Sequence, residues 1–182
     1  REMDEAGMIG VGAALIVDGK VAWMKGYGHA DRERGLPFTP RTVMNIGSIS
    51  KTFTGVAMLQ AVEDGRLDLD AGIDRYLPLK VANPHWPAAA ITLRQLATHT
   101  SSIADRWPVY SATYHYDGET PEPLGAFLAG YLVPGGKDYA PENFLAGKPG
   151  THREYSNIGA GLAGYVVEQA TGQTLGAYAK RR

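Results

Sequence analysis

A serine and a lysine stand one helical turn apart in the run Gly47-Ser48-Ile49-Ser50-Lys51-Thr52-Phe53-Thr54-Gly55. Side chains at positions i and i+3 of a helix are neighbours, with Cβ atoms roughly 5–6 Å apart. The Lys51 amine is therefore expected to reach the Ser48 hydroxyl. At the first turn of a helix, unpaired N–H groups and the positive end of the helix dipole favour an alkoxide or a developing oxyanion. This spacing indicates a serine nucleophile with an amine beside it.

The residues after Ser48 predict a helix that runs from about Ser48 to Asp64. Apolar residues fall on nearly every side of it, which predicts a buried helix, and Gly65 suits the position just after its C-terminus. A lysine beside such a helix loses hydration, so a neutral amine able to accept a proton becomes accessible near pH 7. The alternative is that Ser48 only caps the helix and Lys51 is a solvated side chain. The pair alone does not decide between these interpretations.

A second group of polar residues, Tyr155-Ser156-Asn157, precedes another helical pattern that ends at Thr171-Gly172. Asn157 is expected to be the N-cap of this helix. In an extended segment, residues i and i+2 point to the same side, so Tyr155 and Asn157 would present a phenol and an amide together. A phenol beside a lysine has a lowered pKa and can move the proton of a nucleophile, and a carboxamide can orient a lysine and a substrate amide. An aromatic staple followed by a helix cap is the alternative.

Together, Ser48-x-x-Lys51, Tyr155-x-Asn157 and their flanks resemble the penicillin-recognising serine hydrolases. The likeness is greatest to class C β-lactamases, the related DD-peptidases and the carboxylesterases of that family. It includes residues 45–55, 59–70, 91–102 and 149–151, in the order that the family has them. The resemblance implies an α+β fold of the β-lactamase/transpeptidase type, in which an antiparallel sheet packs against helices beside a mostly helical and loop subregion. One domain is expected over residues 1–182.

The resemblance also implies a role for each residue of the two motifs. Ser48 would be the acylated nucleophile, Lys51 its proton acceptor or activator, Tyr155 the proton shuttle and Asn157 a residue that binds and orients the substrate. No cofactor and no metal are implied. The expected substrate is a small molecule or peptide, namely a β-lactam, a D-Ala-D-Ala-type peptide or a carboxylic ester. A periplasmic or secreted bacterial location is expected, and a cytoplasmic one stays open.

One motif of the family is missing from this sequence. The family carries Lys-Thr-Gly or His-x-Gly on a strand beyond the Tyr-x-Asn helix, and nothing after Asn157 matches it. Lys148-Pro149-Gly150 precedes Tyr155 and is interpreted as a turn, because proline has no N–H for a strand ladder. We therefore expect these 182 residues to be an N-terminal portion with an incomplete sheet, completed by a C-terminal segment or a second chain. The alternative function is a non-catalytic penicillin-binding or sensor domain of the same fold.

Composition excludes several other classes of protein. A net charge of −1 and a pI of about 6.6 give no electrostatic case for nucleic acid as a partner. No apolar run approaches the ~20 residues of a transmembrane helix. The absence of cysteine excludes a thiol nucleophile and disulfides.

The histidines do not predict a metal site. The pairs His29-x-Asp31 and His115-x-Asp117 lack the spacing of a metal site, and His99 is interpreted as a hydrogen-bonding residue of a loop.

Turn signals indicate the remaining organisation. Two antiparallel strands, residues 10–17 and 21–27, are expected around Asp18-Gly19-Lys20. Short helices are expected at 92–97, capped by Thr92, and at 123–132. Four apolar loop residues are expected to tuck against the core: Leu67, Leu69, Ile73 and Leu77. Aromatic residues of the irregular stretch 101–149 either form a wall for an acyl group or anchor loops: Trp107, Tyr110, Tyr114, Tyr116, Tyr139 and Phe144.

Overall fold

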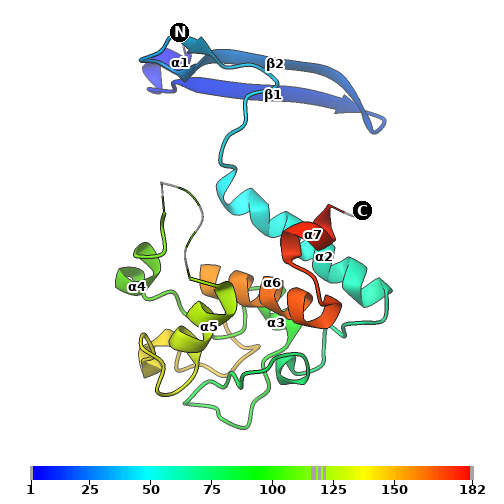
Figure 1. Cartoon of the computed structure of the whole chain (residues 1–182), viewed down its shortest axis with the longest axis vertical. Coiled ribbons are helices and arrows are strands. Elements are labelled where there is room, and N and C mark those ends of the chain that lie inside the picture. The colour runs from blue at the N-terminus through cyan, green and yellow to red at the C-terminus, as the bar shows by residue number, and fades with distance from the viewer. Residues whose placement is uncertain (1, 116–117, 119, 121, 181–182) are drawn as a thin grey trace. The chain divides into compact units, whose positions relative to one another are not determined.

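The computed structural model describes residues 2–115, 118, 120 and 122–180. Contacts within the chain divide it into two compact units, residues 1–47 and residues 48–182. The first contains the strands and the second contains helices α2 to α7 (Figure 1). We refer to them as the sheet unit and the helical unit and describe each by itself.

The sheet unit is a three-stranded antiparallel sheet in the order β1-β2-β3. Helix α1 (Glu2–Glu5) is followed by β1 (Gly10–Val17), β2 (Lys20–Asp31) and β3 (Leu36–Pro37). Asp18 and Gly19 join β1 to β2 with φ angles of 50° and 72°, the backbone of a two-residue hairpin turn whose twist suits the strands. The predicted hairpin is confirmed, although β2 continues past Tyr27.

The sheet unit has a close backbone approach at one glycine and a surface of exposed apolar side chains. Gly26 lies so close to the next segment that a Cβ atom there would collide with the carbonyl oxygen of Phe38, which explains the lack of a side chain. Large apolar side chains of the hairpin are exposed: Leu15, Ile16, Val17, Val21, Trp23, Met24 and Tyr27. The sheet unit therefore does not bury its own hydrophobic surface.

The helical unit is arranged around α6 (Asn157–Thr171). This helix contacts α2 (Ser50–Glu63), α3 (Leu93–Ala97), α5 (Leu124–Leu132) and α7 (Leu175–Ala179), and α4 (Trp107–Ser111) completes the set (Figure 1). Three short 3₁₀ turns occur at Gly47–Ile49, Ile73–Arg75 and Pro141–Asn143. The core consists of fully buried side chains from several of these elements: Leu93, Leu96, Leu128, Tyr131, Leu162, Val166 and Val167.

Local sequence signals set the ends of these helices. Helix α2 ends in a Schellman motif, in which Gly65 N–H donates to Val62 and Arg66 N–H donates to Ala61. Thr92 caps α3, as predicted, and the structure shows that it does so in a capping box with Gln95. The expected cap of α6 is wrong by one residue. Ser156 is the N-cap, because its backbone is extended and its Oγ accepts from the Gly159 N–H at 2.8 Å.

Within the helical unit by itself, one face of α2 is buried, as predicted, and the other is not. Ala57, Met58 and Ala61 are buried, whereas Phe53, Val56 and Leu59 are about half exposed or more. The cause is geometric, since α6 and α7 cover one face of α2 and the opposite apolar face has no cover from those helices. A helix that is apolar all round implies burial only if partners surround it.

The loops of the helical unit are held by buried polar groups as well as by apolar ones. Leu67 and Ile73 are buried, and Leu69 and Leu77 pack against the core, as predicted. Asn83, fully buried, donates from Nδ2 to Ser102 Oγ and to the Leu145 carbonyl oxygen, each at 2.8 Å, and accepts from His85 N–H. This one amide therefore joins three loops that are distant in sequence.

Candidate active site

The four predicted site residues meet within the helical unit, where the start of α2 lies against the start of α6. Ser48 Oγ lies 2.6 Å from the Tyr155 hydroxyl. Lys51 Nζ lies 3.2 Å from Ser48 Oγ and donates to Asn157 Oδ1 at 2.6 Å. An unbroken series of hydrogen bonds thus joins the phenol, the serine hydroxyl, the amine and the amide.

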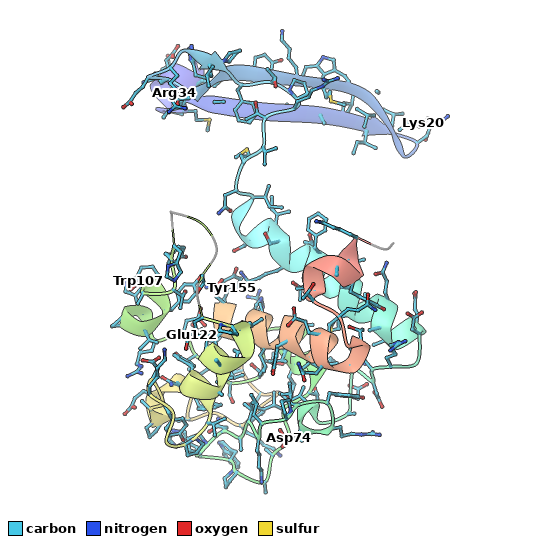
Figure 2. The ribbon with its side chains drawn as sticks, viewed as in Figure 1. Lys20, Arg34, Asp74, Trp107, Glu122 and Tyr155 are labelled. Atoms are coloured by element: carbon cyan, nitrogen blue, oxygen red, sulfur yellow. The ribbon has the colours of Figure 1, made fainter. Side chains whose placement is uncertain are left out.

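Local backbone geometry explains this convergence. Ser48 sits in the 3₁₀ turn that leads into α2, so the Lys51 side chain one turn later reaches back to it. Tyr155 and Asn157 flank the extended N-cap residue Ser156, so they point to the same side. Figure 2 shows Tyr155 beside the first turn of α6.

The loop at His99 fixes the segment that carries Tyr155. The His99 carbonyl accepts from Glu154 N–H at 2.8 Å, and His99 Nδ1 accepts from Ser156 N–H at 3.2 Å. Its ring also packs on the Tyr155 ring, with centroids 4.6 Å apart. Burial, then the charges of Arg153 and Lys51, lower the pKa of His99 against an opposing effect of Asp105. A neutral imidazole with its proton on Nε2 suits an Nδ1 that accepts, and His99 acts as the predicted loop residue.

The pKa of the Tyr155 phenol depends on its neighbours in the site. Lys51, followed by the Ser48 hydroxyl, lowers the pKa of the Tyr155 phenol. Lys51 Nζ also lies 4.9 Å from the centroid of the Tyr155 ring. Because the phenol stays partly exposed, solvent moderates this effect. The lowered pKa eases loss of the phenolic proton, and the contact with Ser48 Oγ gives Tyr155 the geometry to exchange a proton with that hydroxyl.

Asp105 is a member of this group that the sequence did not indicate. Its Oδ1 accepts from Ser156 Oγ at 2.8 Å and from Ile158 N–H at 3.0 Å. Its Oδ2 accepts from the backbone N–H and the side-chain Nδ2 of Asn157, each at 2.8 Å. An anion at a helix N-terminus is stabilised by unpaired N–H groups. No local pattern could reveal this pairing, since Asp105 lies 52 residues before Asn157.

A partly open cavity of about 700 Å³ adjoins the site, between α4, α5 and α6. Asn157, whose amide bonds to Lys51, lines it together with Gly161 one turn later. Most of its other wall residues are apolar or aromatic: Pro108, Val109, Tyr110, Ala112, Leu124, Phe127, Leu128 and Ile158. Glu122 and Lys137, which form a 2.8 Å ion pair, add polar groups to its lining. In Figure 2, the labelled Glu122 lies on the same side of the helical unit as Tyr155.

The loop aromatics divide between the two roles that the sequence left open. Tyr110 lines the cavity and contacts the rings of Trp107 and Tyr114. Phe144 is buried, and Tyr139 packs against the core, so these two anchor loops. Tyr116 lies outside the described residues.

Other sequence features do not gather into a site. Among residues 2–115, 118, 120 and 122–180, no three His, Asp or Glu side chains are close enough together to hold a metal ion. Asp117 of the His115-x-Asp117 pair lies outside the described residues. In the described part of the chain, every helix is too short or too polar to span a bilayer. Lys148-Pro149-Gly150 forms the expected turn, closed by a Thr151 N–H bond to the Lys148 carbonyl.

A comparison with protein-family models places this chain in a known group. The family model described as Beta-lactamase matches residues 1–182. The chain belongs to the β-lactamase family. Its fold class is that of the β-lactamase/transpeptidase group, α+β with an antiparallel sheet, as the sequence predicted.

Relatives within this family are longer than the present chain. The human mitochondrial serine beta-lactamase-like protein LACTB is 40% identical over 104 residues, which are 57% of this chain and 19% of that protein. Protein flp of Staphylococcus aureus is 27% identical over 178 residues, 98% of this chain and 33% of that protein. The structure of the octameric penicillin-binding protein homologue from Pyrococcus abyssi has a TM-score of 0.72 and 30% identity, covering 99% of this chain and 39% of that one. This β-lactamase family chain thus spans between a fifth and two fifths of these proteins.

The electrostatics of the site generate a first prediction. Replacing Lys51 by Met should raise the pKa of Tyr155, because Lys51 is the largest cause of its lowering. Ultraviolet difference titration of each protein against its Tyr155→Phe counterpart isolates this one phenol among ten tyrosines. Lys25→Met, which removes an amine near Tyr27, is the matched control and should leave the Tyr155 titration in place. An unchanged Tyr155 titration in Lys51→Met would contradict the prediction.

Proposed function

We propose that this chain performs serine acyl transfer, with Ser48 as the nucleophile. The observation that carries this proposal is the series of contacts from Tyr155 through Ser48 Oγ to Lys51 and Asn157. A serine hydroxyl is a weak nucleophile unless a neighbouring base accepts its proton. Here two candidate bases contact one hydroxyl, an arrangement that a helix cap does not need. Membership of a family of serine hydrolases supports the same reaction.

In the proposed reaction, Ser48 Oγ attacks a carbonyl carbon while its proton passes to Tyr155 or to Lys51. The tetrahedral intermediate collapses with cleavage of the bond to the leaving group, which takes up the proton. Asn157 orients Lys51 and contacts the substrate amide. Water then hydrolyses the acyl-enzyme, with the same residues accepting and returning a proton. These steps need no cofactor and no metal.

The proposed substrate is a β-lactam, a D-Ala-D-Ala-type peptide or a carboxylic ester. The apolar cavity beside Asn157 supports an acyl group with an apolar or aromatic portion, since such pockets bind apolar groups and leave orientation to a few polar ones. The penicillin-binding description of the relative from Pyrococcus abyssi supports the first two substrates. A periplasmic or secreted location is part of this proposal, and the relative from Staphylococcus aureus supports a bacterial setting for it.

The second candidate is a non-catalytic penicillin-binding or sensor domain that is acylated once. It is supported by the description of the relative from Pyrococcus abyssi as a penicillin-binding protein homologue. The two candidates differ in turnover, so counting product molecules per labelled serine separates them.

Covalent labelling tests the nucleophile. Ser48→Ala should abolish labelling by a fluorescent penicillin or a fluorophosphonate, because the attacking oxygen is removed, while circular dichroism stays that of the folded protein. Ser50→Ala, which removes a hydroxyl two residues away, is the matched control and should label as the unchanged protein does. Mass spectrometry that finds the adduct on Ser50 or Ser156 would overturn the assignment.

The cavity makes a prediction about acyl-group selectivity. A Cβ atom on Gly161 would meet Leu124 at 3.8 Å, an ordinary contact, so Gly161→Ala should be tolerated. Gly161→Leu should fill part of the cavity and lower kcat/KM for long-chain p-nitrophenyl esters about 10-fold relative to the acetyl ester, since a few methylenes are worth this much discrimination. Equal losses for short and long acyl chains in Gly161→Leu, with Gly161→Ala as control, would show that the acyl group lies elsewhere.

We further propose that a C-terminal segment or a second chain completes this catalytic domain. Among the described residues the sheet has three strands, of which β3 has two residues, and the unpaired edges of such a sheet are normally protected, which supports this. The completing segment would supply the missing third motif and an oxyanion donor, whose loss costs on the order of 10²–10³ in rate. The 182-residue chain alone should then be poorly soluble or nearly inactive beside the full-length protein. A soluble, cooperatively folded 182-residue chain with an ordinary turnover rate would refute this idea.

A further inference from the structure

The carboxylate of Asp105 accepts hydrogen bonds from four donor groups. Two are the backbone N–H groups of Asn157 and Ile158, one is the Ser156 hydroxyl, and one is the side-chain Nδ2 of Asn157. An ionised carboxylate only accepts hydrogen bonds. The end of the Asn157 amide that faces Asp105 must therefore be its NH₂ group.

The opposite end of the same amide faces Lys51. A carboxamide is planar, with a donor at one end and an acceptor at the other. With Nδ2 directed to Asp105, Oδ1 is directed to Lys51 Nζ, 2.6 Å away. A reversed amide would place its oxygen against the Asp105 carboxylate and its NH₂ against an amine that only donates when protonated. Both contacts would then be lost.

We propose that Asp105 is a positioning residue of the active site, which fixes the orientation of the Asn157 amide and thereby holds the Lys51 amine beside Ser48. The hydrogen bonds of Asp105 go to Ser156, Asn157 and Ile158, so it acts on Lys51 through Asn157. Insofar as Lys51 activates Ser48, this inference rests on the proposed acyl transfer. The orientation itself does not depend on any reaction.

A purely structural role is the competing explanation, because Asp105 also satisfies N–H groups at the start of α6. The two roles predict opposite changes at Tyr155. The negative charge of Asp105 raises the pKa of Tyr155, whereas Lys51 is the largest of the causes that lower it. Loss of the Asp105 charge alone would therefore lower the pKa of Tyr155. Loss of the Lys51 position would raise it, and this larger effect should dominate.

The decisive experiment is the titration of Tyr155 in the full-length protein with Asp105→Asn, measured by ultraviolet difference against the same protein that also carries Tyr155→Phe. We expect the pKa of Tyr155 to rise toward that in Lys51→Met. A lower or unchanged pKa would overturn the proposal. Ser156→Ala is the matched control, since it removes another donor to Asp105 and the cap of α6 but leaves the Asn157 amide in place. It should lower the melting temperature without moving the Tyr155 titration.

If Asp105→Asn does not fold, a double variant that exchanges the two side chains, Asp105→Asn with Asn157→Asp, tests the proposal instead. Asn157→Asp alone places two carboxylates against each other and should lower the rate of labelling by fluorophosphonate at least 10-fold. Adding Asp105→Asn restores a donor facing an acceptor, and the carboxylate at position 157 can still accept from Lys51. The double variant should therefore label faster than Asn157→Asp, and labelling that is equally slow or slower would overturn the proposal.

These two measurements separate the positioning role from the reaction. If the unchanged protein is not labelled by fluorophosphonate or by penicillin, the proposed acyl transfer fails. The titration still supports or overturns the role of Asp105, because it follows a proton on Tyr155 and needs no turnover.

Discussion

The hydrogen bonds of Lys51 Nζ join the two helices on which the site depends. One bond runs to Ser48 Oγ on the turn before α2, and the other crosses to Asn157 Oδ1 at the start of α6. The amine therefore links residues more than a hundred positions apart. The packing of α2 on α6 sets the distance that the Lys51 side chain spans to reach Asn157. Core residues of these two helices, such as Ala57 and Leu162, therefore help to determine the geometry of the site.

The segment that carries Tyr155 and Asn157 is held by loop residues as well as by its helix. His99 binds the backbone on both sides of Tyr155, and Asp105 binds the backbone and side chain of Asn157. Each of these contacts satisfies a polar group that would otherwise be left without a partner near the helix start. Tyr155 and Asn157 are thus held in place by groups outside the motif, so the proposed reaction at Ser48 would need little rearrangement of its neighbours.

Local spacing was sufficient to predict the pairs within the site. Ser48 with Lys51, and Tyr155 with Asn157, follow from the repeat of a helix and of an extended segment, and the cap at Thr92 follows from its sequence. What spacing could not predict are the contacts that depend on tertiary structure. Asp105 and His99 act on residues more than fifty positions later, and nothing beside them in the sequence marks this. The cap of α6 was misassigned because Ser156 and Asn157 both suit a cap. In the structure, Ser156 Oγ accepts from the Gly159 N–H, while the Asn157 amide is bonded to Asp105 and Lys51.

The buried amide of Asn83 has an implication for how the protein tolerates change. Two of its partners are the Leu145 carbonyl and the His85 N–H, which are backbone atoms. Any amino acid at position 145 offers that carbonyl and any except proline at position 85 offers that N–H, so the identities of the side chains there are left free by this contact. Position 83 has no such freedom, because few side chains carry a donor and an acceptor of this size. Among related sequences, the loops around this amide can therefore diverge in composition while a single asparagine preserves their path.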